Sequence, residues 1–366
     1  MKPCKAPDSD SSPLETGAKL FVPGRLCLLG EHSDWAAEFG MHEGFCLVIG
    51  TDQGLSAEAS IANDFTVETL VPDIKGRPTG RTRRMSCRWN DAMLRLAAND
   101  DDEFFRYCAG VAHEMYSRQG VAGGIDIRIR AMDLPLRKGV SSSAAVCILV
   151  AKAFDMVYRL GMFPHELMDV AYRGERLTGS QCGRMDQACI YGKTPVLLAF
   201  ASSGQIRVEP VHPEGDIYMF FVDLAGRKDT IGILSDLRAA YPKSPSLRHA
   251  LGPGNERIVR LGCSSLVRGD ARELGELMIE AQNVFDCEIA PHSPVQLASP
   301  LLHEVLSMKE LSPYIWGGKG VGSQGDGAAQ FVARSRQDRD AAMRIITQSH
   351  PHMQCFPLTV VARERL

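Results

Sequence analysis

The sequence predicts a protein that mixes β-strands and α-helices and divides into two lobes. Ile125, Ile127 and Ile129 alternate with charged residues, and this period of two is typical of a strand with one buried face. Apolar residues at helical spacing follow over residues 146–157. The chain has 366 residues, which is more than a single hydrophobic core usually serves, so we expect two lobes.

The same two periodicities predict the other elements in chain order. We expect strands where apolar residues form short runs, over residues 19–22, 45–49, 195–200, 217–224 and 330–333. We expect helices where apolar residues recur every three or four positions, over residues 104–115, 166–177, 229–240 and 274–285. Prolines and glycines dominate residues 242–254, which predicts a loop there.

The overall composition is that of an ordinary globular protein, with 45% hydrophobic and 23% charged residues. The net charge of −3 gives no electrostatic case for a nucleic acid or an anionic membrane as partner. The cysteines include no Cys-x-x-Cys pair, which indicates reduced thiols in a cytoplasmic protein rather than a zinc site. No apolar run is long enough to cross a bilayer.

Residues 135–144 form a candidate phosphate-binding loop between a strand and a helix. The loop contains Gly139 and three consecutive serines, and Arg137 and Lys138 precede them. Backbone N–H groups at a helix N-terminus attract anions, and small side chains let a polyphosphate approach them closely. One serine alone would be explained as an ordinary helix cap. The segment is not a Walker loop, because no Gly-Lys-Ser/Thr sequence follows the turn.

A second polar cluster follows an apolar strand that ends near Gly30. Glu31, His32 and Asp34 occur within four residues there. Carboxylates and imidazole discriminate sugar hydroxyls by hydrogen-bond geometry, so these residues are a candidate sugar site. The alternative is a solvated loop that contains a chance Glu-His pair.

Four segments resemble motifs of the GHMP small-molecule kinase superfamily, which includes galactokinase, homoserine kinase and mevalonate kinase. Residues 23–35 are similar to the first galactokinase motif, Pro-Gly-Arg-x-x-Leu-x-Gly-Glu-His-x-Asp-Tyr, with Trp35 at the Tyr position. Residues 135–144 resemble the second motif, with Val140 in place of Leu. Residues 182–187 resemble the Cys-Gly-x-Met-Asp-Gln segment that carries the catalytic aspartate of galactokinases and their arabinose- and uronate-kinase relatives. Residues 319–329 match the glycine-rich third motif in part.

The resemblance implies an α+β fold of two lobes. The N-terminal lobe would be like domain 2 of ribosomal protein S5, and the C-terminal lobe would be ferredoxin-like. We expect a disordered lead-in over residues 1–17, an ATP-binding N-terminal kinase domain over residues 18–213 and a C-terminal kinase domain over residues 214–366. The oligomeric state stays open.

The resemblance also implies transfer of the ATP γ-phosphoryl group to a monosaccharide hydroxyl, with the anomeric hydroxyl as the preferred acceptor. Asp186 would be the catalytic carboxylate with Arg25 beside it, and the first-motif acids and histidine would bind the sugar. Ser143 and Glu175 would hold Mg²⁺. The residues that would bind the ATP phosphates are Lys138, Gly139, Val140, Ser141, Ser142, Ser143 and Ala144.

Several alternatives remain beside the sugar 1-kinase. On local grounds Asp186 could be a plain helix cap. Another kinase of the superfamily, of uronate, heptose or mevalonate type, and a non-catalytic sugar sensor on the same scaffold are the rival functions. Arg227 and Lys228 stand where galactokinases are rich in Asn, which argues against galactose itself. The two cations could bind a uronate, but a solvated pair is the simpler interpretation, so a neutral aldose is the expected acceptor.

Overall fold

The structure is a computed structural model that describes residues 17–72, 78–134, 142–180 and 182–363. The chain forms two compact units that interleave along the sequence. Unit 1 consists of Met1–Val22, Gly54–Asp133 and Ser143–Cys182, and unit 2 consists of Pro23–Gln53, Leu134–Ser142 and Gly183–Leu366. The domain boundary near residue 213 stays a prediction. The predicted lead-in lies outside the described residues except for Gly17.

The sheet of unit 1 has the strand order β4–β3–β5–β2. Strand β3 (Phe65–Pro72) pairs with β4 (Pro78–Cys87) in an antiparallel hairpin and with β5 (Gly124–Met132) in parallel. The second half of the long strand β2 (Gly44–Ala62) pairs antiparallel with β5. Ile125 and Ile127 are fully buried while Arg128 is exposed, which confirms the half-buried strand that the alternating sequence predicts.

Helices cover the buried face of this sheet. Phe154 stacks on Phe65 of β3 with 6.2 Å between the ring centroids, and Trp89 packs on Phe154. The predicted helices 104–115, 146–157 and 166–177 are confirmed. The helices of unit 1 are α2 (Asp91–Ala97), α3 (Glu103–Ser117), α4 (Ser142–Tyr158) and α5 (Pro164–Leu177).

Unit 2 takes in most of β1 (Ala18–Leu29), which pairs with β2. The first half of β2 pairs antiparallel with β6 (Val196–Phe200), and β6 pairs with β7 (Ile206–Pro210). These strands matter for the site, because the chain leaves β1 directly into the loop that carries the predicted sugar-binding residues.

The second sheet of unit 2 is antiparallel throughout, in the order β11–β8–β10–β9. Its strands are β8 (Ile217–Asp223), β9 (Ile315–Gly320), β10 (Ala328–Ala333) and β11 (Gln354–Val360). A Cβ atom at Gly317 of β9 would lie 2.1 Å from the carbonyl oxygen of Gly275 in α9. Only glycine therefore allows α9 to pack so closely on β9.

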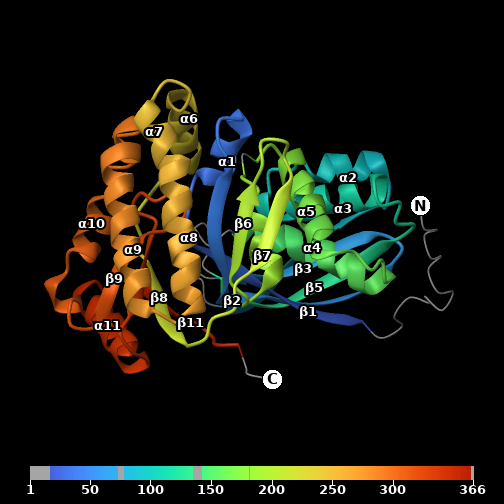
Figure 1. Cartoon of the computed structure of the whole chain (residues 1–366). Helices are drawn as coiled ribbons and strands as arrows, with labels where there is room; N and C mark the ends of the chain where they lie inside the picture. The colour runs from blue at the N-terminus through green and yellow to red at the C-terminus, as the bar shows by residue number, and fades with distance from the viewer. Residues whose placement is uncertain (1–16, 73–77, 135–141, 181, 364–366) are drawn as a thin grey trace. The chain divides into compact units, whose positions relative to one another are not determined.

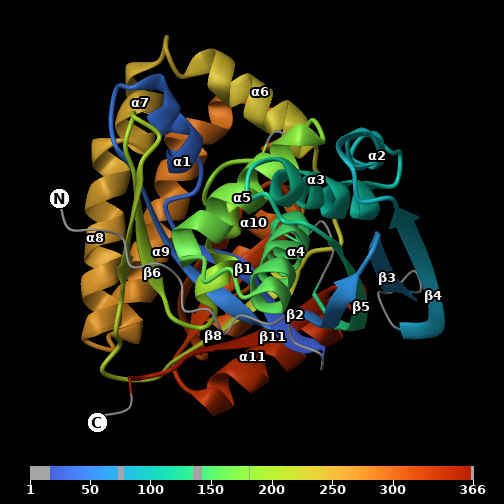
Figure 2. The ribbon, with the colours of Figure 1, turned by 90° about the vertical axis from the view of Figure 1, so that its right-hand side faces the viewer.

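The described part of unit 2 also contains the short helix α1 (Ser33–Ala36) and six further α-helices. Helices α8 and α9 run side by side in both views (Figures 1 and 2). The six are α6 (Thr230–Ala240), α7 (Pro245–Leu251), α8 (Pro253–Val267), α9 (Ala271–Val284), α10 (Pro300–Leu306) and α11 (Arg336–Ser349). The mixture of sheets and helices confirms the predicted α+β class.

The loop predicted over residues 242–254 is wrong, because α7 and the start of α8 occupy most of it. Ser244 caps α7 by accepting a hydrogen bond from the Leu247 N–H at 3.2 Å. Pro245 and Pro253 stand in the first turns of the two helices, where the missing N–H of proline costs nothing. The prolines therefore mark helix starts and not a loop. Among the described residues, no helix has the length and apolar character that crossing a bilayer requires.

Candidate active site

The loop that follows β1 is buried, although it is rich in polar residues. Glu31, His32, Ser33 and Asp34 each expose 8% or less of their surface. They are therefore not part of a solvated loop. His32 has a left-handed backbone with φ of 67°, which is uncommon for a residue other than glycine and is found often at functional sites.

Ser33 is the member of this loop that the fold itself explains. Its hydroxyl donates to the carbonyl of Leu251 at 3.2 Å and accepts from the N–H of Phe45 at 2.8 Å. Both bonds anchor the loop to other parts of unit 2. Ser33 is thus a structural residue.

Arg25 and Asp186 form an ion pair in unit 2. Arg25 lies on β1 and is 3% exposed, and Asp186 begins a 3₁₀-helix, Asp186–Tyr191. Burial, the largest single influence, lowers the pKa of the Arg25 guanidinium, but the charge and hydrogen bond of Asp186, together with the charges of Cys27 and Asp34, raise that pKa overall. The structure therefore brings the two predicted catalytic residues together.

Asp34 joins this pair as a second carboxylate. Its Oδ2 accepts a hydrogen bond from the Met185 N–H at 3.4 Å. A Cβ atom at position 183 would lie 1.8 Å from the same oxygen, so this approach requires Gly183. Burial and, next, the charge of Asp186 raise the pKa of Asp34 to about 6, against the opposing effect of Arg25. Two carboxylates and one guanidinium therefore share this site.

His32 is held as a neutral imidazole with a defined tautomer. The indole Nε1 of Trp35 donates to His32 Nδ1 at 3.0 Å, so the ring proton is on Nε2. Burial lowers the pKa of His32 to about 3; the backbone of Ser323 opposes this shift, and Lys228, Lys319 and Arg238 add to it. The backbone of Ser323 is near enough to this ring to raise its pKa, but no well-formed hydrogen bond from Nε2 is present within the described residues. His32 is therefore suited to donate to a bound ligand.

Glu31 forms an ion pair with Lys319, a residue to which the sequence motifs assign no role. Lys319 is the penultimate residue of the glycine-rich strand β9 and is 1% exposed. A lysine in such a strand is unusual, because a buried ammonium needs a partner. Residue 319 also begins the partial match to the third motif, but neither signal names its partner.

The residues predicted for phosphate and metal binding are described only in part. Lys138, Gly139, Val140 and Ser141 lie outside the described residues. The other three begin α4, where Ser142 and Ser143 are half-buried and Ala144 is buried.

Glu175, the other predicted metal ligand, lies on α5 with 1% of its surface exposed, and the Ser180 hydroxyl donates to it at 3.4 Å. A hydroxyl and a buried carboxylate are hard oxygen donors of the kind that Mg²⁺ prefers. The donor set of Ser143 and Glu175 therefore fits the metal.

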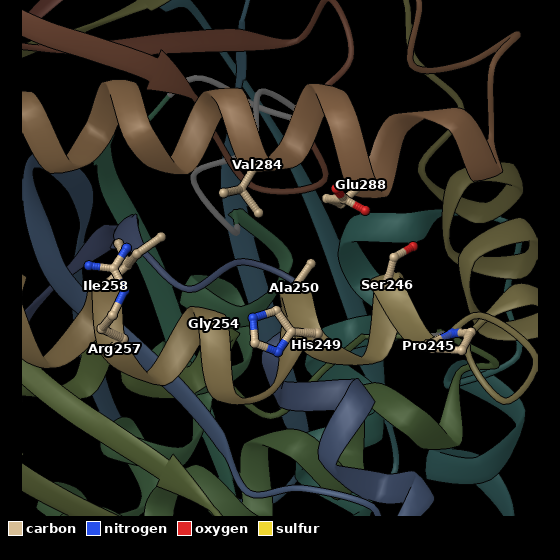
Figure 3. A pocket seen from close by; sticks show the side chains of 9 residues that line it. All are labelled: Pro245, Ser246, His249, Ala250, Gly254, Arg257, Ile258, Val284 and Glu288. Carbon is tan, nitrogen blue, oxygen red and sulfur yellow. The ribbon is translucent and has the colours of Figure 1, made fainter.

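A cavity of about 500 Å³ lies among α7, α8 and the end of α9 (Figure 3). Its polar lining includes Ser246, His249, Arg257 and Glu288. None of the predicted site residues lines it, so it does not belong to the candidate active site.

Comparison with known families identifies part of the chain. Residues 106–193 match the GHMP kinases N terminal domain. The match covers the second predicted motif and the aspartate segment.

Solved structures of similar fold extend the likeness over nearly the whole chain. Mevalonate kinase of L. major, in complex with R-mevalonate, aligns with a TM-score of 0.71 and 19% identity over 97% of this chain and 100% of its own. Galactokinase of Lactococcus lactis, complexed with galactose, aligns with a TM-score of 0.71 and 16% identity over 96% and 95%. Homoserine kinase of Cytophaga hutchinsonii aligns with a TM-score of 0.66 and 16% identity over 97% of each chain. At these identities the likeness establishes the fold.

Proposed function

We propose that this chain, which has the GHMP kinase fold and carries a GHMP kinase N-terminal domain, is an ATP-dependent sugar kinase that phosphorylates a monosaccharide, preferably at the anomeric hydroxyl. One observation carries the proposal. The buried Arg25 pairs with the partly exposed Asp186 beside a buried carboxylate, Asp34, whose loop also carries Glu31 and His32. A packed core does not need this concentration of polar groups, whereas recognition of a polyol does.

The proposed acceptor site uses Glu31, His32 and Asp34. The two carboxylates accept hydrogen bonds from sugar hydroxyls, and the Nε2–H of His32 donates to a sugar oxygen. A sugar hydroxyl can both donate and accept, so this set distinguishes a polyol from an apolar ligand. A ligand that lacks one hydroxyl leaves a buried group unpaired and is rejected.

The proposed catalytic group is Asp186. It accepts the proton of the attacking hydroxyl or orients that hydroxyl toward the phosphoryl group. Arg25 holds Asp186 in place and stabilises negative charge that moves during transfer. Phosphoryl transfer needs little covalent help from the protein, so positioning and charge stabilisation supply most of the rate.

The proposed nucleotide-binding residues belong to the segment that precedes α4 in the sequence and to the first turn of α4. Residues 138–144 would bind the ATP phosphates through backbone N–H groups. Ser143 and Glu175 would hold Mg²⁺, which when bound neutralises phosphate charge. A place in the cytoplasm stays a prediction.

A neutral aldose is the proposed acceptor class. Glu31 is paired with Lys319 and Asp186 with Arg25, so the site has no large excess of either charge. A uronate remains the second choice because Lys228 packs against Gly327 and its charge lowers the pKa of His32. Mevalonate and homoserine are further candidate acceptors only because kinases that act on them share this fold.

An acceptor screen tests the function. ATP consumption would be measured with galactose, arabinose, glucuronate, galacturonate, a heptose, mevalonate and homoserine, and the product would be located by NMR. We expect turnover with a neutral aldose and a phosphate on its anomeric oxygen. Turnover with mevalonate or homoserine alone would refute a sugar kinase, and sugar binding without any turnover would indicate the sensor.

The variant Asp186→Asn tests the mechanism. We expect turnover to fall on the order of a hundredfold or more, because the acceptor hydroxyl loses its proton acceptor. ATP affinity should stay unchanged, measured by titration calorimetry. Asp52→Asn is the matched control, since Asp52 is an acid of unit 2 in an exposed pair with Lys193. Near-normal turnover in Asp186→Asn would remove this residue from the mechanism.

A further inference from the structure

Lys319 is a buried cation that contacts Glu31, a residue of the candidate acceptor site. Its Nζ donates to the carboxylate of Glu31 and to the carbonyl of Gly320 at 2.8 Å. A buried ammonium costs several kcal/mol in lost hydration, so the fold tolerates it only with such partners. The pair joins residues that are 288 positions apart in the chain.

A glutamine on α9 fixes the backbone beside Lys319. Gln282 accepts from the Gly320 N–H at 2.8 Å and donates to Gln324 Oε1 at 3.0 Å. Gln324 has a left-handed backbone, with φ of 60°, in the glycine-rich loop that follows β9. The end of β9 is therefore held by side-chain bonds in addition to its sheet partners, which leaves Lys319 little freedom to move.

A neighbouring strand holds the same part of β1. Gln330 on β10 stands directly opposite Lys319, so the two side chains lie on one face of the sheet. Gln330 Nε2 donates to the Cys27 carbonyl of β1 at 2.6 Å. The β9–β10 pair thus holds β1 at Cys27 and the loop after it at Glu31.

We infer that Lys319 is a positioning residue for acceptor recognition, which orients the carboxylate of Glu31 and balances its charge. Lys319 engages Oε1, so the other carboxylate oxygen is available to a sugar hydroxyl. Without Lys319, Glu31 is a buried carboxylate that has lost its ion-pair partner, and nothing fixes its orientation. The inference rests on the proposed function, because it concerns the same site.

Lys319→Met removes the charge and keeps most of the side-chain volume. We expect the KM for the accepted sugar to rise tenfold or more, because Glu31 loses its orientation. The KM for ATP should stay within about twofold, since Lys319 makes no described contact with the nucleotide residues. Lys193→Met is the matched control, as it removes an exposed lysine that pairs with Asp52. The control should keep both KM values.

A double variant shows whether Lys319 acts through Glu31. If it does, Lys319→Met combined with Glu31→Gln should have the sugar KM of Glu31→Gln alone, because the two changes remove one interaction. The double variant also leaves no unpaired buried charge, so it serves if Lys319→Met alone does not fold. A further tenfold rise in the sugar KM of the double variant would overturn the inference.

The inference and the proposed function fail in different ways. If the wild-type protein phosphorylates no sugar of the panel, the proposed function fails. If it phosphorylates a sugar and Lys319→Met keeps the wild-type sugar KM, only the inference fails. Equal losses in the KM for sugar and for ATP would also overturn the inference, because a general loss of structure would explain them.

Discussion

Neighbouring residues of one loop differ in what they contribute to the fold. Ser33 makes two hydrogen bonds that anchor the loop, whereas Asp34 is a buried carboxylate that lies near the like charge of Asp186. Burial and that repulsion disfavour the charged form of Asp34. A group that the fold destabilises and does not need is a strong candidate for function.

Asp34→Asn should stabilise the protein at neutral pH. The pKa of Asp34 is about 6 in the folded state against an ordinary value of 3.8, so the folded state binds the proton more tightly. Its contribution to the free energy of unfolding therefore falls as pH rises from 3.8 to 6, by roughly 2–3 kcal/mol in all. The variant should be more stable than wild type by up to this amount at pH 7, and the difference should vanish near pH 4.

Urea denaturation at pH 7, 6, 5 and 4 measures this difference. The variant should also use the sugar poorly, since an amide replaces the carboxylate proposed to accept hydrogen bonds from sugar hydroxyls. Asp52→Asn, a change at an exposed acid, should show no such pH-dependent gain. If Asp34→Asn is less stable than wild type at pH 7, burial of the charged Asp34 carboxylate does not destabilise the fold.

Element ends carry the candidate chemistry in this fold. Glu31 follows the end of β1, Asp186 begins a 3₁₀-helix and Lys319 lies at the end of β9. Backbone hydrogen bonding fixes each element, so the side chains at its end are positioned accurately. They can also reach a ligand, because the regular structure stops there. Glu175 near the end of α5 follows the same rule.

Glu175→Gln tests the proposed metal ligand on α5. If the carboxylate binds Mg²⁺, the Mg²⁺ concentration for half-maximal activity should rise about tenfold or more. Asp169→Asn is the control on the same helix, because Asp169 is exposed and pairs with Arg173. Magnesium titrations of ATP turnover compare the two. An unchanged magnesium dependence in Glu175→Gln would leave this residue with a structural role only.

At the scale of the whole molecule, the buried histidine and the buried aspartate make stability depend on pH in opposite directions. His32 has a pKa of about 3 in the folded state against 6.5 ordinarily, so the unfolded state binds its proton more tightly. The contribution of His32 to the free energy of unfolding is therefore fully present above pH 6.5, and it is lost as pH falls toward 3. Asp34 opposes this loss between pH 6 and 3.8.

His32→Asn should flatten the loss of stability in acid. Below pH 6.5, His32 lowers the free energy of unfolding by about 1.4 kcal/mol per pH unit. The variant has no imidazole and therefore lacks this loss. Asparagine tolerates the left-handed backbone at this position. Urea denaturation from pH 7 to 4 should show the variant gaining on wild type as pH falls, while the exposed His42→Asn should follow wild type. Parallel curves for His32→Asn and wild type would refute the depressed pKa.

The sequence by itself determined most elements and the members of the polar cluster that follows Gly30. The alternation around Ile127 and the helical spacing over residues 166–177 indicate which face of each element is buried. This information is local, because it lies in residues that are close together in the sequence. Glu31, His32 and Asp34 were recognisable for the same reason, since they stand within four residues. The loop predicted over residues 242–254 was wrong because proline is common both in loops and in the first turn of helices.

Only the tertiary structure decided the state of those groups. It set the tautomer of His32 through Trp35, the pKa of Asp34 through burial, and the pairing of Glu31 with Lys319. That pair depends on the register of β9 with β10 and on the packing of α9, which no local pattern encodes. Periodicity records the environment of neighbours in the chain, whereas an ion pair across 288 positions depends on which strands and helices meet.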